Sequence, residues 1–226
     1  NMRGKNFCLL TAGMAVFAFL AGRALTAGNC AVRTGAPVNA DGRPEIALTF
    51  DDGPDEVWTP KLLDGLKERE VQATFFLLGQ SIEGNEAVVK RMQEEGHLIG
   101  NHTYSHVELT KLSPEEAREE VVRTSSAIYD VTGVYTSFVR PPFGEWPDGL
   151  EFRVTMIPVN WTVDSRDWYT RNTPVIVRDV LDAAGPGDII LMHDCYETSV
   201  EAALQIVDTL KAEGYEFVTV DELILE

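Results

Sequence analysis

The sequence predicts an α/β fold in which a parallel sheet closes into a barrel or a distorted barrel, with helices outside it. Short apolar runs that resemble strands alternate with helix-like segments from residue 45 to residue 226. Repeated βα units of this kind are typical of parallel sheets, and their number suits a barrel. A content of 44% hydrophobic and 24% charged residues is ordinary for a globular protein and argues against disorder.

Periodicity and capping signals locate the individual elements. Leu62, Leu63 and Leu66 have helical spacing. The run Ser113-Pro114-Glu115-Glu116 is a capping box with proline at the first helical position, and it opens a long helix. The expected strands cover residues 45–50, 73–78, 98–100, 138–140, 159–163, 188–192 and 217–220. The expected helices cover residues 60–69, 86–95, 114–131, 174–184 and 199–212.

The first 44 residues have a different character. Arg3 and Lys5 precede an apolar run over residues 7–22, which is typical of a secretory signal peptide. The run Leu25-Thr26-Ala27 is an imperfect cleavage site, so a membrane anchor is the alternative for residues 1–27. Residues 28–44 are expected to be a linker, and residues 45–226 the catalytic domain. We therefore expect export to the cell envelope or medium, with membrane contact only through the first segment.

Charge and cysteine content indicate which partners and which disulfide bonds to expect. The chain carries 36 acidic and 19 basic residues, for a net charge of −17. So acidic a protein would repel phosphate backbones, which excludes nucleic acid as a partner. Outside the first segment only Cys30 and Cys195 remain, and we expect both to be free thiols rather than a disulfide framework. Oligomeric state is left open.

Unusual polar clusters follow the expected strands at the points where they end. These clusters are Asp51-Asp52, His102 with His106, Arg140, Asp164 with Asp167, and His193-Asp194. In a β/α barrel, the carboxyl ends of the strands converge on one face, and active sites are built there. The clusters are therefore expected to form one site.

Two histidines and two aspartates have the chemistry of a metal centre. The imidazoles of His102 and His106 are four residues apart, so both can reach one ion. Asp51 and Asp52 end an apolar strand, where neighbouring side chains point to opposite sides unless the backbone turns. We expect Gly53-Pro54 to supply that turn. One carboxylate can then join the histidines as a ligand while the other serves as a general base; the alternative is a turn whose aspartates only bind backbone N–H groups.

Five motifs in order resemble those of the NodB-type polysaccharide deacetylases, which are the carbohydrate esterases of family 4. The resemblance covers residues 45–226 and implies the distorted (β/α) barrel of that family. The motifs are Thr49-Phe50-Asp51-Asp52-Gly53-Pro54, the His102/His106 pair, Arg140-Pro141-Pro142-Phe143-Gly144, Asp164-Ser165-Arg166-Asp167-Trp168 and Leu191-Met192-His193-Asp194.

The resemblance also implies a role for each residue around the metal. Asp52, His102 and His106 match the ligands of one divalent metal ion, zinc or alternatively cobalt, which would activate a water and polarise the acetyl carbonyl. Asp51 matches the catalytic base that takes the proton of the water. Arg140 matches the residue that pairs with this base and orients it.

The remaining matched residues handle the leaving group and the acetyl group. His193 resembles the general acid that protonates the departing amine or alcohol, and the charge of Asp167 would favour its imidazolium form. The backbone N–H of Phe143 is expected to stabilise the oxyanion. Trp168 and Leu191 match walls of the pocket for the acetyl methyl group.

The resemblance implies a polysaccharide substrate. The exported leader favours the N-acetylglucosamine of peptidoglycan, with chitin oligomers and acetylated xylan as alternatives. Two other interpretations compete with a deacetylase. Non-haem Fe(II) oxygenases also use two histidines and one carboxylate, but they need no second aspartate and no His193. An inactive relative that binds glycans would have lost one of the matched residues, and all of them are present.

Three further expectations concern residues outside the motifs. Residues 145–158 leave little room for a helix that the family usually has there, so one wall of the substrate groove is expected to differ. His97 is expected to be structural. Cys195 lies two residues past His193, but a metal-activated water needs no nucleophilic thiol.

Overall fold

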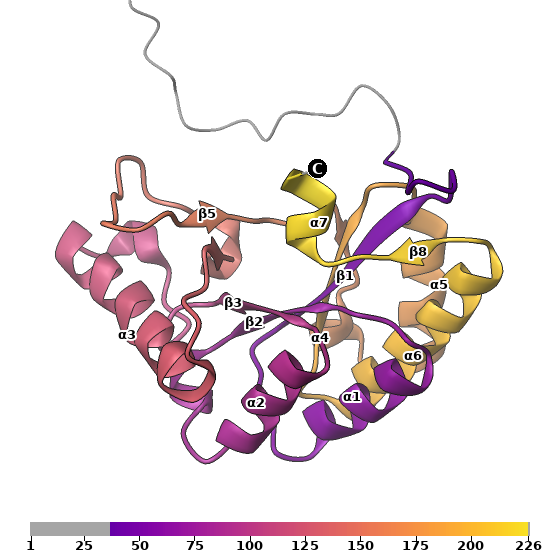
Figure 1. Cartoon of the computed structure of the whole chain (residues 1–226), viewed down its shortest axis with the longest axis horizontal. Helices are drawn as coiled ribbons and strands as arrows, with labels where there is room; N and C mark the ends of the chain where they lie inside the picture. Colours follow the sequence, from indigo (N-terminus) through magenta and orange to yellow (C-terminus); the bar gives the residue numbers. More distant parts are fainter. Residues whose placement is uncertain (1–36, 226) are drawn as a thin grey trace, which may run out of the picture. The chain divides into compact units, whose positions relative to one another are not determined.

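One parallel sheet organises the residues that the computed structural model describes, which are 37–225 (Figure 1). Its strand order is β5-β4-β3-β2-β1-β7-β6, with β8 paired to the first residues of β1, and every pairing is parallel. The ladder ends at β5 on one side and at β6 on the other. The sheet is thus a curled half-barrel, and the predicted distorted barrel is confirmed. The strands are β1 (Glu45–Asp51), β2 (Thr74–Leu77), β3 (Leu98–Asn101), β4 (Phe138–Val139), β5 (Ile157–Pro158), β6 (Val163–Asp164), β7 (Ile189–His193) and β8 (Glu216–Phe217).

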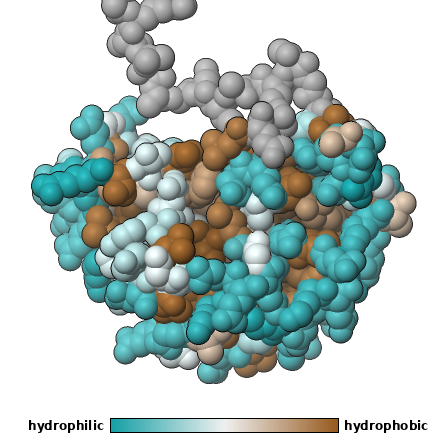
Figure 2. Space-filling model, in the orientation of Figure 1, coloured by the Kyte–Doolittle hydropathy of each residue, from teal (hydrophilic) through white to brown (hydrophobic). Residues whose placement is uncertain are grey.

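Five longer helices pack side by side around the sheet in the order α3-α2-α1-α6-α5, and Figure 1 shows them along its outer side. Hydrophilic side chains cover much of their outer surface in Figure 2, in keeping with the acidic composition. The capping box predicted at Ser113 is present at the start of α3. The helices are α1 (Trp58–Glu68), α2 (Glu86–Glu94), α3 (Pro114–Thr132), α4 (Asp167–Thr170), α5 (Thr173–Ala183), α6 (Glu197–Ala212) and α7 (Val220–Leu225), with 3-10 turns η1 (Gly79–Ser81), η2 (Leu109–Lys111) and η3 (Pro142–Gly144).

Strand β1 shows how the core places a carboxylate inside the barrel. All seven of its residues are buried. Ile46, Leu48 and Phe50 belong to the large apolar cluster shared with the outer helices, whereas Ala47 belongs to a second cluster that includes residues of α7. Side chains alternate between the two faces of a strand. Asp51 therefore shares the inner face with Ala47.

The strand predicted over residues 159–163 is wrong. The chain instead forms β5 and β6, which lie at opposite ends of the sheet, and residues 159–162 cross between them. The backbone carbonyls of Val159 and Asn160 accept hydrogen bonds from the Arg140 guanidinium, at 3.1 and 3.3 Å. A buried arginine inside the barrel thus binds backbone groups in the crossing segment.

Two other segments differ from expectation or refine it. Val220 was expected to end a strand but begins α7, where the N–H of Thr219 donates to the Glu222 carboxylate and stabilises the helix start. Residues 145–156 form no helix, as expected from their length. Trp146, Leu150 and other apolar side chains of this segment pack against a small cluster formed by η2, α3 and β4. A packed loop therefore forms this wall.

The first segments of the chain lie mostly outside the described residues. The predicted leader, the first part of the predicted linker and Cys30 all belong to residues 1–36. Residues 37–44 form a turn closed by an antiparallel bridge between Val38 and Pro44. Within residues 37–225, no helix combines the length and hydrophobicity needed to span a bilayer.

Candidate active site

The carboxyl ends of the parallel strands bring the predicted residues together. Asp51 at the end of β1 is in register with His193 at the end of β7. On the other side of β1, β3 ends at Asn101, directly before His102. Asn101 is in register with Val139, which precedes Arg140. The five polar clusters that the sequence places after strands thus lie along one edge of the sheet.

Asp52, His102 and His106 form a compact three-residue cluster. Their ligand atoms all lie within 4.8 Å of one another. Asp52 Oδ1 lies 3.5 Å from His102 Nε2 and 3.6 Å from His106 Nε2. The Nδ1 atom of His102 is 2.7 Å from the carbonyl oxygen of Arg140, so this nitrogen donates its proton and Nε2 keeps a free lone pair.

The cluster fits a divalent metal ion. Asp52 Oδ1 is buried without any hydrogen-bond partner, and a buried oxygen of this kind is costly unless something binds it. Zinc takes nitrogen and oxygen ligands at about 2.0–2.2 Å, which places neighbouring ligand atoms of a tetrahedron about 3.4 Å apart. The two separations from Asp52 Oδ1, 3.5 and 3.6 Å, are close to that value. Burial lowers the pKa of His102, although nearby Asp51 and Asp52 oppose the shift, so its neutral ligand form is favoured.

The turn between the two aspartates occurs earlier than expected. Asp52 itself has a φ of +73°, so the backbone turns at the ligand rather than only at the following Gly53-Pro54. Thr103 and His106 also have positive φ, at 68° and 57°. Non-glycine residues adopt this conformation rarely, and they are concentrated at functional sites. The turn at Asp52 therefore lets both aspartates approach His102, whose Nε2 lies 3.7 Å from Asp51 Oδ2 and 3.5 Å from Asp52 Oδ1.

Two residues that the sequence analysis missed hold the histidine loop in place. The side chain of Asn101 accepts the N–H of Thr103 and donates to Val121 in α3. The carboxylate of Glu120, also in α3, accepts the N–H groups of Tyr104 and Ser105 at 3.0 and 2.9 Å. Asn101 adjoins His102 in the sequence, which is a usable signal. Glu120 lies outside the motifs, and no sequence signal marked it.

Asp51 pairs with a fully buried arginine. Arg140 Nη1 donates to Asp51 Oδ1 at 2.8 Å and to the Thr49 hydroxyl at 2.6 Å. The side chain of Arg140 is 0% exposed and that of Asp51 is 4% exposed. The second oxygen of Asp51 lies 3.7 Å from His102 Nε2. Asp51 is thus fixed beside the cluster with one oxygen bonded to Arg140 and the other directed toward His102.

His193 also borders the cluster, and it pairs with Asp167. Its Nδ1 is 2.7 Å from Asp167 Oδ1, and its Nε2 is 3.9 Å from Asp52 Oδ2. Burial alone would lower the pKa of His193, but the hydrogen bond and charge of Asp167, aided by Asp51 and Asp52, raise it to about 9. The imidazolium form can therefore persist at neutral pH with Nε2 facing the cluster.

Asp194, directly after His193, packs against Gly53 in the turn that follows the two aspartates. Its side chain is fully buried and accepts a hydrogen bond from the Thr59 hydroxyl. Burial raises its pKa to about 7. A Cβ on Gly53 would lie 2.4 Å from both carboxylate oxygens, so only glycine leaves room for this contact.

The three residues predicted to surround the acetyl group have different exposure. Phe143 in η3 has a φ of +61° and is 62% exposed, and its ring lies edge-on to His106 with centroids 5.0 Å apart. Trp168 in α4 is 52% exposed, and Leu191 in β7 is 5% exposed. Trp168 donates its backbone N–H to Asp167. Phe143 and Trp168 therefore adjoin the cluster and the Asp167–His193 pair respectively.

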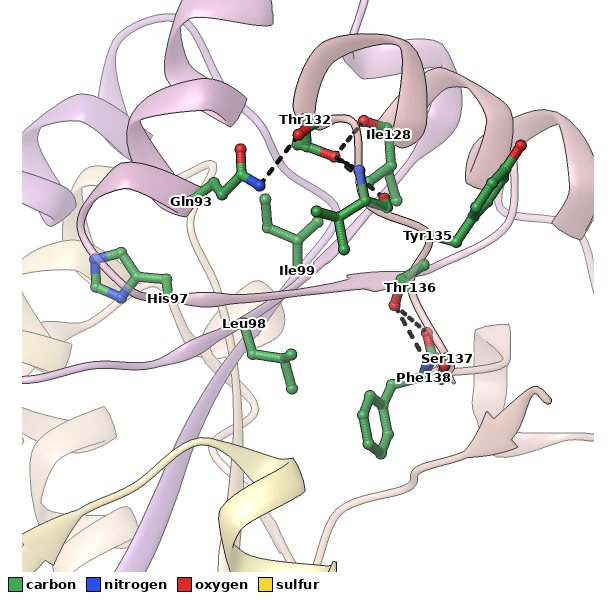
Figure 3. A pocket seen from close by; sticks show the side chains of 11 residues that line it. Gln93, His97, Leu98, Ile99, Ile128, Thr132, Tyr135, Thr136, Ser137 and Phe138 are labelled. Atoms are coloured by element: carbon green, nitrogen blue, oxygen red, sulfur yellow. Dashed lines mark hydrogen bonds between the residues drawn. The ribbon is translucent and has the colours of Figure 1, made fainter. Parts of the chain in front are cut away.

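His97 and Cys195 remain outside this arrangement. His97 lies at the amino end of β3, in the lining of an apolar pocket that also contains Ile99 and Phe138 (Figure 3). Its Nδ1 accepts the Ala73 N–H, and burial lowers its pKa to about 4. The other end of β3 carries the cluster. Burial raises the pKa of the Cys195 thiol to about 12, which disfavours a nucleophilic thiolate.

Comparison with known sequences identifies the same family over most of the chain. The polysaccharide deacetylase family profile matches residues 39–156. The peptidoglycan-N-acetylglucosamine deacetylase PgdA of Listeria monocytogenes is 43% identical over 178 residues, which is 79% of this chain and 38% of that protein. A peptidoglycan-N-acetylglucosamine deacetylase of Bacillus cereus is 41% identical over 192 residues, covering 80% and 68% of the two chains. The chain thus spans well under half the length of the Listeria relative.

Solved structures of similar proteins support the same family assignment. The peptidoglycan deacetylase PdaC from Bacillus subtilis superposes with a TM-score of 0.78 at 42% identity, over 80% of this chain and 90% of that one. A family 4 acetyl xylan esterase from Clostridium thermocellum, solved with a cobalt ion, gives a TM-score of 0.73 at 37% identity, over 79% and 89%. With its half-barrel and its Asp-His-His cluster, the chain belongs to the polysaccharide deacetylase family.

Proposed function

We propose that this protein removes acetyl groups from the N-acetylglucosamine residues of peptidoglycan by metal-assisted hydrolysis. The observation that carries the proposal is the arrangement around the Asp52–His102–His106 cluster, which the Asp51–Arg140 pair and the His193–Asp167 pair both border. Hydrolysis of an amide needs a base for the attacking water and an acid for the leaving amine. The two pairs supply one of each.

Asp52, His102 and His106 would hold the ion, for which zinc and cobalt are the candidates. When bound, such an ion lowers the pKa of a water molecule and polarises a carbonyl oxygen. Two imidazoles and one carboxylate are a donor set that catalytic zinc sites use.

The Asp51 carboxylate takes the proton of the attacking water. Its first oxygen is held by Arg140, and its second oxygen is directed toward the cluster. The guanidinium of Arg140 is permanently charged and makes further bonds to Thr49 and Val159, so it fixes the base in one orientation. As the carbonyl becomes a tetrahedral oxyanion, the Phe143 backbone N–H would donate a hydrogen bond to it.

His193 protonates the leaving nitrogen. A pKa of about 9 keeps the imidazolium populated at neutral pH, and the bond from Nδ1 to Asp167 leaves Nε2 facing the substrate. Transfer of this proton releases acetate and a free glucosamine amine. Asp167 acts only through His193, whose ring it orients and whose charge it stabilises.

The substrate class rests on the named relatives. The Listeria and Bacillus cereus proteins are peptidoglycan-N-acetylglucosamine deacetylases. Acetylated xylan is the second candidate, because a bifunctional xylanase/deacetylase of Pseudobutyrivibrio xylanivorans is 36% identical over 96% of this chain. The catalytic residues do not distinguish an acetamide from an acetyl ester.

Export completes the proposal, since peptidoglycan lies outside the cytoplasm. Its support is the basic and apolar segment over residues 3–22. Expression of the full chain followed by cell fractionation tests this part: we expect the protein in the envelope or medium, and recovery in the cytoplasm alone would contradict it.

The substrate test compares kcat/KM for β-1,4-linked N-acetylglucosamine oligomers and acetylated xylo-oligomers at identical metal loading. We expect a clear preference for the N-acetylglucosamine oligomers. A preference for xylan would overturn the substrate while leaving the catalytic assignment intact. Binding of both glycans without any acetate release would instead favour an inactive relative; a similar solved structure, at 30% identity, is of a mutant of a CE4 family pseudoenzyme.

A further inference from the structure

Two adjacent aromatic side chains project from the catalytic edge of the sheet. Trp168 and Tyr169 belong to α4, which follows β6, and they are 52% and 77% exposed. Their ring centroids lie 5.7 Å apart with an angle of 64° between the planes. Burying two such rings against a ligand would remove apolar surface from water. We call Trp168 and Tyr169 the aromatic ledge.

The backbone that carries the ledge is bonded at both ends. Arg171 Nε donates to the Trp168 carbonyl at 2.8 Å, and the Arg171 guanidinium lies 3.3 Å above the centre of the Tyr196 ring. At the other end, Tyr169 donates its N–H to the Arg166 carbonyl at 3.1 Å. The turn is therefore fixed to the loop that follows β7. A surface ordered before binding loses less entropy when a ligand arrives.

The backbone at both ends of α4 is strained. Arg166 and Arg171 have φ values of +52° and +48°. Arginine gains nothing from this conformation, which costs free energy for any residue with a side chain. Surrounding contacts must therefore impose it.

The ledge adjoins the leaving-group side of the reaction. Trp168 donates its N–H to Asp167 Oδ1, the same oxygen that bonds His193 Nδ1. In the proposed function His193 protonates the departing nitrogen, which stays attached to the glycan. The part of the substrate that remains bound after acetate leaves therefore lies next to the ledge.

We propose that Tyr169 is a specificity-determining residue: it binds the pyranose ring next to the sugar that is deacetylated. This inference rests on the proposed function and deepens it. The flat faces of a β-linked pyranose expose C–H groups that pack on an aromatic ring, while hydroxyl groups at the rim stay hydrated. The ledge thus favours oligomeric over monomeric substrates and a sugar chain over an isolated acetyl group.

The test uses the metal-loaded full chain and the variants Tyr169→Ala and Tyr169→Phe. Rates are measured on N-acetylglucosamine oligomers of two to five sugars and on a small aryl acetate. For Tyr169→Ala we expect the ratio of kcat/KM on the pentamer to that on the aryl acetate to fall about tenfold, mainly through KM. Tyr169→Phe keeps the ring and should restore the ratio.

Tyr135→Ala is the matched control, because Tyr135 is 60% exposed and stacks on Tyr129 beside the pocket at the other end of β3. It should leave the ratio at the wild-type value. An equal loss on all substrates would mean that Tyr169 only shapes the catalytic residues, and an unchanged ratio would mean that no sugar binds there. Either result overturns the inference.

A binding measurement separates this inference from the proposed function. Calorimetric titration of metal-loaded Asp51→Asn with the pentamer should give an affinity about tenfold higher than that of Asp51→Asn/Tyr169→Ala. If the wild type releases no acetate but the two affinities differ as expected, the proposed reaction fails and the ledge stands. If acetate is released but the affinities are equal, the ledge fails alone.

Discussion

Two carboxylate–cation pairs border the Asp52–His102–His106 cluster, and they differ in which member, the anion or the cation, faces it. In the first pair Asp51 faces the cluster, and the fully buried Arg140 binds Asp51. In the second pair His193 faces the cluster, and the buried Asp167 binds His193. The reacting group is therefore an anion in the first pair and a cation in the second.

The difference lies in which member can lose its charge. Arg140 stays protonated under all ordinary conditions, so Asp51 keeps a constant partner. His193 titrates, with a pKa of about 9, so the second pair can give up a proton and recover it. A fixed pair suits a base that must stay oriented, and a titrating pair suits an acid. This contrast makes four predictions, ordered from the largest effect to the smallest.

The largest effect on activity should follow from removing the metal ion from the Asp52–His102–His106 cluster. Removing metal with a chelator, or replacing a ligand in His102→Ala, should abolish acetate release, because each pair then has no activated water or polarised carbonyl to act on. Metal content and acetate release are measured on the same sample. Re-addition of zinc or cobalt should restore the chelated wild type but not His102→Ala. Full activity in the metal-free protein would contradict metal-assisted hydrolysis.

Asp51→Asn tests the first pair directly. We expect a fall in kcat of about 10²- to 10⁴-fold, because the amide cannot accept the proton of the water. Metal content should stay at the wild-type level, since Asp52, His102 and His106 are untouched. Near-normal turnover at full metal content would show that Asp51 is not the base.

Arg140→Met should lower the free energy of unfolding, because Arg140 and Asp51 form a buried pair. The substitution leaves the Asp51 carboxylate buried without its partner and removes donors from Val159 and Asn160. Loss of one member of a buried pair costs about 3–5 kcal/mol. The free energy of unfolding is measured by denaturant titration. Asp167→Asn should cost less, because His193 can become neutral, and equal losses would contradict the distinction between the pairs.

Asp167→Asn should shift the pH dependence of activity. The pKa of His193 is raised because Asp167 bonds to its charged form, and burial opposes that shift. Without the carboxylate, burial dominates and the pKa falls. The alkaline limb of the kcat/KM profile should then move to lower pH by about one unit or more. An alkaline limb at its wild-type position would contradict the coupling of Asp167 to His193.

Much of the site was predictable because its residues follow strands within recognisable motifs. Asp51, Asp52, His102, His106, Arg140, Asp167 and His193 each lie at or near a strand end, and the parallel sheet brings them together. Glu120 was not predictable. It supports the histidine loop from the middle of α3, and only the packing of α3 against η1 and β3 places it there.

The errors in the fold have a related cause. The apolar pattern of residues 159–163 is that of a strand, but the carbonyls of Val159 and Asn160 accept hydrogen bonds from Arg140. A local pattern cannot show that a distant arginine competes for backbone groups. The short helices α4 and α7 were missed because helices of four and six residues carry too little periodicity to detect.

The most direct test of the account is to count both products of one reaction. Zinc-loaded protein is incubated with a β-1,4-linked N-acetylglucosamine oligomer, and released acetate and new free amine are quantified together. We expect equal amounts of the two from the wild type, and none from Asp51→Asn at the same metal content. Oligomer binding without acetate or amine, with zinc and with cobalt, would contradict the account and leave a glycan-binding protein instead.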